Sequence, residues 1–145
     1  MSATIKHLLQ TLADGVEGFS TAAKSVKDPE LRVLFEGFAA ERHEMATELT
    51  AHSHADPQDE AATVAGTLHR GWINLKSALT AGDDYAILAE CELGEDHALK
   101  VFNEALDAPP SPEAVPTIGS ISIRILAVHN EVKRRRDAAR EFHRR

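Results

Sequence analysis

The sequence predicts an all-α protein, in which two antiparallel helical hairpins form a four-helix bundle and an additional crossover helix connects them. The 145 residues are 43% hydrophobic but only 5% aromatic, a composition poor in the aromatic and β-branched runs that strands favour. Apolar residues recur at three- and four-residue spacing in five segments, as expected for amphipathic helices. Breaks that contain proline or glycine separate these segments.

The first hairpin is predicted to pair a helix over residues 3–26 with a helix over 29–52. The sequence KDPE at 27–30 separates the two. Pro29 suits the first turn of a helix, and Asp28 before it suits the N-cap position. The second helix is expected to end in the polar loop that follows residue 52.

The remaining three helices are predicted over 59–80, 83–107 and 117–142. Gly82, in the sequence AGDD, suits the glycine position that follows the end of a helix. The segment DAPPSPEAVP, with four prolines in ten residues, separates the last two helices. The helix over 59–80 is the shortest of the five, at about 33 Å. We therefore assign it as the crossover along a bundle formed by the other four, with residues 1–145 as a single domain.

Composition limits the classes of function. The net charge of −7 argues against broad nucleic-acid binding. Cys91 is the only cysteine, so no intrachain disulfide is expected. No apolar run reaches the roughly 18 residues that a membrane span needs, and the N-terminal segment lacks the apolar core of a signal peptide. We expect a cytoplasmic protein.

The runs LADGVEGFSTAAKSVKDPELRVLF and AGTLHRGWINLKSALTAGDDYAILAECELGED resemble a bacterial family of ferritin-like four-helix bundles labelled domain of unknown function 2383. The motifs LHRGW, GDD, ILAE and GED, in that order, carry the resemblance, which covers roughly residues 4–108. It implies a ferritin-like fold and superfamily, but no activity, because a fold does not determine a function.

Two glutamates interrupt the apolar stripe of the segment LAECELGEDHALKVF at 88–102. At about 100° per residue, Glu92 and Glu95 share an arc of about 80° with the apolar residues of that helix. Polar side chains of the other bundle helices are predicted at the same level: Arg42 and Glu41, His129 and, on the flank of the first helix, Glu17.

One interpretation of these residues is a metal site. Di-iron proteins of the ferritin-like fold place one Glu on each of two helices and a Glu-x-x-His pair on each of the other two. The candidate ligands here are Glu41, Glu92, Glu95 and His129, with Glu17 as a further candidate, and they would suit iron, manganese or zinc. The pattern is incomplete, because Glu44 follows Glu41 where histidine is needed and Leu126 precedes His129 where glutamate is needed.

The other interpretation is a structural ion pair, and we favour it. A buried carboxylate without a counter-charge costs several kcal/mol. Arg42 points toward the predicted core and supplies that charge to Glu92 and Glu95 without a metal. The guanidinium would suit a bidentate contact with one of the two glutamates.

Three functions remain open. The favoured one is a non-enzymatic structural or interaction module with a buried Glu/Arg cluster, assembled as a homodimer. The second is an iron- or manganese-binding protein of metal storage or oxidative stress, with ferroxidase-like activity. The third is a stress-related nucleic-acid-associated protein, because residues 131–145 carry a net charge of +4 against −11 for the rest of the chain. Its contacts would come from Lys133, Arg134, Arg135 and Arg136.

Overall fold

The structure is a computed structural model that describes residues 2–52, 72, 75–81 and 83–144. Over these ranges it is all-helical. Its elements are α1 (Ala3–Ser25), α2 (Pro29–Thr50), α4 (Leu75–Ala81), α5 (Asp84–Asp107), the short 3₁₀ helix η2 (Pro112–Ala114) and α6 (Val115–Arg144). The prediction of an all-α protein is confirmed. In the described part of the chain, no helix has the length and apolar character needed to cross a membrane.

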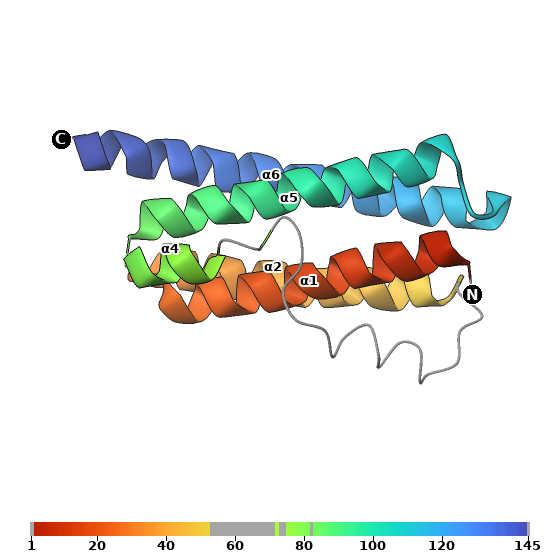
Figure 1. Cartoon of the computed structure of the whole chain (residues 1–145), viewed down its shortest axis with the longest axis horizontal. Helices are drawn as coiled ribbons and strands as arrows, with labels where there is room; N and C mark the ends of the chain where they lie inside the picture. The colour runs from red at the N-terminus through yellow and green to blue at the C-terminus, as the bar shows by residue number, and fades with distance from the viewer. Residues whose placement is uncertain (1, 53–71, 73–74, 82, 145) are drawn as a thin grey trace.

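The four long helices lie side by side in two antiparallel pairs, α1 with α2 and α5 with α6 (Figure 1). The predicted start of α2 is confirmed: the side chain of Asp28 accepts a hydrogen bond from the Glu30 amide at 2.9 Å, and Pro29 occupies the first turn. Ser2 caps α1 in the same way, through the Ile5 amide. Each cap satisfies an amide that has no partner within its helix.

The second pair begins with a similar cap, since the side chain of Asp83 accepts a hydrogen bond from the Tyr85 amide at 2.9 Å. Helix α6 begins at Val115, two residues before its predicted start. Pro116 therefore lies inside the helix, at its second residue. A first-turn proline is tolerated there because the amide it lacks would have no helical partner.

Two contacts fix the directions of the helices. Asp84, at the start of α5, accepts hydrogen bonds from the Lys27 and Asp28 amides in the turn between α1 and α2. At the opposite end, His52 follows α2 and contacts the hydroxyl of Thr117 in α6 at 2.8 Å. Helices α2 and α5 therefore run in the same direction, and the end of α2 and the start of α5 lie at opposite ends of the helices (Figure 1).

The predicted crossover helix over 59–80 and its cap at Gly82 lie mostly outside the described residues. The described part consists of Trp72, which is buried, and α4, which packs on α5 and α1.

Two apolar clusters make up the core that the described residues form. The first lies toward the α1–α2 turn and includes Phe19, Phe35 and Trp72. The second lies toward the N-terminus of α1 and includes Leu12 and Phe102. Along α2 and α5, the buried polar residues lie where the sequence passes from one cluster to the other, so the polar groups of interest sit in the middle of the helices.

Candidate functional site

Arg42 of α2 and Glu95 of α5 form a buried ion pair, in which Nη2 donates to Oε1. Both side chains are only 1% exposed. The guanidinium carbon lies 5.6 Å from the centroid of the Phe19 ring, and Nη1 lies 3.5 Å from the sulfur of Met45. The positive charge that faces Glu95 is therefore a guanidinium surrounded by apolar and aromatic groups.

Gly15 of α1 makes room for this arginine. A Cβ atom at Gly15 would lie 2.7 Å from Nε of Arg42 and 2.8 Å from its Cγ. Such distances are too short for non-bonded atoms, so a side chain at residue 15 would displace the arginine. The position of Arg42 in α2 therefore depends on the absence of a side chain at Gly15 in α1.

The Arg42–Glu95 pair leaves part of the hydrogen-bonding capacity of both side chains unused. Oε2 of Glu95 and Nε of Arg42 are buried and have no hydrogen-bond partner among the residues that the structure describes, so the contact is not the bidentate one that the guanidinium geometry suggests. Burial raises the pKa of Glu95, and the charge and hydrogen bond of Arg42 offset that rise in part. Ionised Glu95 is therefore costly in this position, and it depends on Arg42.

Glu92 lies one turn away from Glu95 but pairs with a different arginine. Nη1 of Arg136, in α6, lies 2.6 Å from Oε1 of Glu92. Both side chains are partly buried. This pair was not predicted from the sequence. The signal that could have indicated it is the position of Arg136 near the apolar side of its helix.

Glu41 and Glu17 lie apart from the buried pair. Glu41 is partly exposed at the α2–α6 contact, where Arg124 approaches it at 3.4 Å and also pairs with Glu48 at 2.9 Å. Glu17 is exposed on α1. Of the four residues proposed as metal ligands from the sequence, the structure brings two together, Glu92 and His129.

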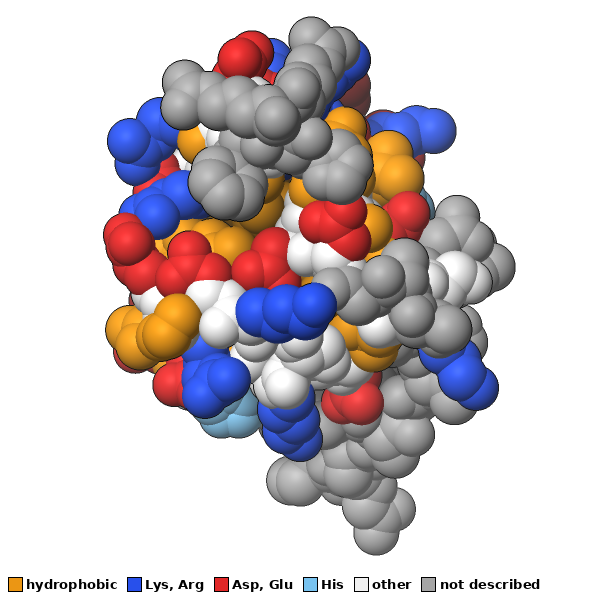
Figure 2. Space-filling model, turned by 90° about the vertical axis from the view of Figure 1, so that its left-hand side faces the viewer, with side chains coloured by type: hydrophobic (Ala, Val, Ile, Leu, Met, Phe, Trp, Pro, Cys, Tyr) orange, Lys and Arg blue, Asp and Glu red, His pale blue; other side chains and the backbone are white. Residues whose placement is uncertain are grey.

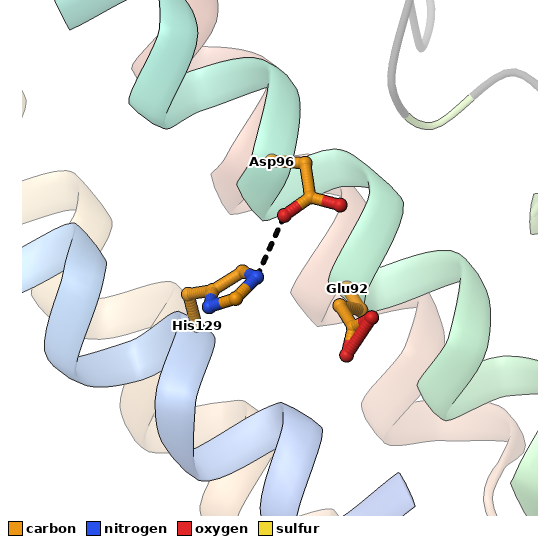
Figure 3. A group of neighbouring side chains, drawn as sticks. All are labelled: Glu92, Asp96 and His129. Atoms are coloured by element: carbon orange, nitrogen blue, oxygen red, sulfur yellow. Dashed lines mark ion pairs between the residues drawn. The ribbon is translucent and has the colours of Figure 1, made fainter. Parts of the chain in front are cut away.

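Asp96 completes a small cluster with Glu92 and His129. Ligand-type atoms of the three side chains lie within 4.8 Å of one another. Nε2 of His129 lies 2.6 Å from Oδ1 of Asp96. Figure 3 shows that α5 supplies both carboxylates and α6 supplies the imidazole, which points toward Asp96. Sequence reasoning omitted Asp96, although its four-residue spacing from Glu92 places both on one face of α5.

The indole of Trp72 is wedged between two helices. It packs edge-on against Phe19, with ring centroids 5.0 Å apart. Its ring atoms occupy the space into which side chains at Gly18 of α1 and Gly94 of α5 would point. Gly94 belongs to the GED motif and Trp72 to LHRGW, so two motifs that are distant in sequence meet in one contact.

The basic residues of α6 are largely paired within the chain. Arg134 and Arg135 both contact Glu131, and their hydrogen bonds lower the pKa of that carboxyl group. Arg135 also reaches Glu30 of α2 at 2.8 Å. With Arg136 engaged by Glu92, three of the four residues predicted to contact nucleic acid are in ion pairs, whereas Lys133 is exposed. Fewer of these four positive charges are therefore available to a nucleic-acid partner than their number in the sequence suggests.

A pocket of about 620 Å³ lies between the α1–α2 turn, the start of α5 and the second half of α6. Figure 2 views this end of the molecule, where acidic, basic and apolar side chains are intermingled. The pocket's carboxylates include Asp28, which caps α2, and Asp84, which binds the turn. These two carboxylates already accept hydrogen bonds that stabilise the fold.

Cys91 is fully buried next to the ion pair. Burial, together with the negative charges of Glu95 and Glu90, raises the pKa of the thiol well above its usual value. A thiol that stays protonated is a poor nucleophile and a poor metal ligand. Cys91 is therefore a core residue.

A comparison with curated proteins finds no match. A comparison with family models matches residues 1–108 to the family described as "Domain of unknown function (DUF2383)". The matched part includes Arg42, Glu95, Trp72 and the three glycines around them. Helix α6, with His129 and Arg136, lies beyond it. Because the match covers well over half of the 145 residues, the chain belongs to the DUF2383 family.

Proposed function

We propose that this protein is a ferritin-like four-helix bundle that serves as a structural or interaction module, without enzymatic activity. The observation that carries the proposal is the Arg42–Glu95 pair. In a ferritin-like di-iron protein, inward carboxylates at mid-bundle are neutralised by metal. Here a guanidinium with 1% exposure faces the inward carboxylate of Glu95, and Gly15 provides the space for it.

The separate ion pairs of the other acidic groups support the same proposal. Glu41 faces Arg124, and Glu92 faces Arg136. Each of these inward or flanking carboxylates thus has its own arginine from another helix. A protein that used the three glutamates as ligands for one metal centre would need to rearrange three ion pairs, at a cost in desolvation and packing.

An interaction module needs an exposed apolar surface, and α6 carries one. Val115, Ile123 and Leu126 are exposed, and at about 100° per residue they share an arc of about 80° on the helix. A second copy of the chain is the partner that we expect, because a two-fold contact needs only one self-complementary surface. Light scattering on the wild type and on Ile123→Glu tests this, with a dimer expected for the wild type and a monomer for the variant.

The decisive test separates a structural pair from a ferroxidase centre. Oxidation of Fe²⁺ in air is measured with the wild-type protein, with Glu95→Gln and with buffer alone. We expect all three rates to agree. Faster oxidation with the wild type that is lost in Glu95→Gln would overturn the proposal, because Glu95 would then act as an iron ligand.

A further inference from the structure

We propose that Glu92, Asp96 and His129 form a binding site for a divalent first-row transition ion, of which Zn²⁺ is the best example, at the seam between α5 and α6. This site is separate from the buried Arg42–Glu95 pair. It takes its histidine from the helix opposite its two carboxylates, and it opens to solvent through Asp96, whose side chain is 52% exposed.

The first support is geometric. Glu92 and Asp96 lie one helical turn apart on α5, so their side chains share a face, and His129 approaches that face from α6 (Figure 3). The donor atoms lie within 4.8 Å of one another. Ligands at about 2.0–2.2 Å from Zn²⁺ in a tetrahedral arrangement lie about 3.3–3.6 Å apart. The three side chains therefore need only small rotations to share one ion.

The second support is the orientation of the imidazole. Nε2 of His129 faces the cluster, and Nδ1 lies 3.3 Å from Oδ1 of Asn130 on its other side. When Nδ1 carries the hydrogen, it donates to Asn130 and leaves the lone pair of Nε2 for a metal. Histidine ligands in metal sites commonly have this arrangement, in which an oxygen acceptor holds the second ring nitrogen and fixes the orientation of the ring.

The third support is the state of Glu92. Arg136 donates to Oε1 at 2.6 Å, whereas Oε2 is buried and no described residue offers it a hydrogen bond. A buried carboxylate oxygen without a partner is costly, and coordination to a metal is one way to satisfy it. Arg136 then holds the carboxylate in place through one oxygen and leaves the other for the ion.

The alternative is a metal-free ion-pair network, in which Arg136 neutralises Glu92, and His129 and Asp96 share a proton. The 2.6 Å contact between His129 and Asp96 needs that proton, because both atoms otherwise present lone pairs to each other. A metal ion would replace the proton and bind both ligands. One imidazole and two carboxylates suit Zn²⁺, Mn²⁺ or Fe²⁺, and among these Zn²⁺ binds most tightly to a given set of ligands.

The experiment uses the full chain after treatment with a chelator. Titration with ZnCl₂ is followed by calorimetry, and titration with CoCl₂ by the visible absorption of the bound ion. We expect one ion per chain. In Asp96→Asn and His129→Gln, each of which removes one ligand, we expect the affinity to fall by at least about tenfold.

Glu104→Gln is the matched control, because it removes an exposed carboxylate from the same helix outside the cluster. We expect it to bind Zn²⁺ and Co²⁺ as the wild type does. Thermal unfolding monitored by circular dichroism establishes that all three variants fold. Two results would refute the site. One is that the wild type binds neither Zn²⁺ nor Co²⁺ when the metal is at 100 times the protein concentration. The other is that the wild type, Asp96→Asn and His129→Gln bind the metal equally well.

Discussion

The indole ring of Trp72 lies against the backbone of Gly94, in the space that a side chain at residue 94 would occupy. The same ring also occupies the space that a side chain at Gly18 of α1 would enter. A buried tryptophan thus separates α1 from α5, and its size is accommodated only because both helices carry glycine at the contact. Glycine within a helix is intrinsically unfavourable by about 0.5–1 kcal/mol, so packing has to compensate at both positions.

Gly94→Ala and Gly18→Ala should each lower the free energy of unfolding by about 1–3 kcal/mol, because the added methyl group overlaps the indole ring. Gly37→Ala is the matched control, since no atom of the described part of the chain lies within 4 Å of a Cβ at that position of α2. This control should raise stability by about 0.5–1 kcal/mol through helix propensity alone. Urea denaturation of the three variants measures the difference. Equal effects at all three positions would show that Trp72 does not fill this space.

Arg42→Met should destabilise the protein by about 3–5 kcal/mol, because it leaves Glu95 buried without a counter-charge. Arg124→Met makes the same substitution in a partly exposed network with Glu41 and Glu48, where a loss of about 1 kcal/mol or less is expected. Urea denaturation at pH 7 compares the two. A loss for Arg42→Met no larger than that for Arg124→Met would contradict a structural role for the buried pair.

The double variant Arg42→Met/Glu95→Met isolates the interaction between the two charges. With both charges removed, apolar side chains fill the space between the two core clusters, and stability should return to within about 1–2 kcal/mol of the wild type. The coupling free energy from the double-mutant cycle then reports how strongly each residue depends on the other. A double variant less stable than Arg42→Met would mean that the pair contributes more than mutual neutralisation.

Glu95 should also make stability depend on pH. Its pKa is raised from 4.5 by burial, against the lowering effects of Arg42 and, more weakly, His129, while Glu41 adds to the rise. The folded protein therefore binds a proton more tightly than the unfolded chain does. The contribution of Glu95 is fully favourable below pH 4.5 and is lost as the pH rises through its folded pKa.

The measurement compares the wild type with Glu95→Gln, which cannot titrate at this position. The difference in unfolding free energy, wild type minus variant, should fall as the pH rises above about 4.5 and then become constant above the folded pKa of Glu95. Acidic groups that do not interact with Glu95 titrate alike in both proteins, so their effects cancel in the difference. A difference that rises with pH would show that Arg42 dominates and that the pKa is lowered.

Local chemistry explains why so much of the fold follows from the sequence. Asp28 and Pro29 act within one turn of the chain, and the period of the apolar residues places Arg42 and Glu95 on inward faces without knowledge of any partner. Such signals need no information about other helices. The sequence places the start of α6 two residues too late, because Pro116 resembles the end of a break although a proline is tolerated in the first turn of a helix.

The candidate site depended on relations that no local pattern contains. Whether Glu92 meets Arg42 or Arg136 is set by the rotation of α5 against both α2 and α6 and by the reach of each arginine. Long flexible side chains span several ångströms, so an inward direction does not fix a partner. Gly94 has no apolar side chain to mark it as a contact, and its role appears only once Trp72 is placed beside it.

Asp84 joins the two halves of the structure, because its two carboxylate oxygens accept hydrogen bonds from the Lys27 and Asp28 amides at 2.8 and 3.0 Å. Asp84→Ala leaves both amides without these acceptors and should lower the free energy of unfolding by about 1–2 kcal/mol, a moderate value because the contact is exposed. Asp107→Ala, at the exposed end of the same helix, is the matched control and should leave stability unchanged or slightly raised, since a negative charge is unfavourable at a helix C-terminus. Urea denaturation measures both variants, and hydrogen exchange at the Lys27 and Asp28 amides gives an independent reading. Faster exchange at these two amides in Asp84→Ala alone is the expected result, and unchanged exchange would show that the turn is held by other contacts.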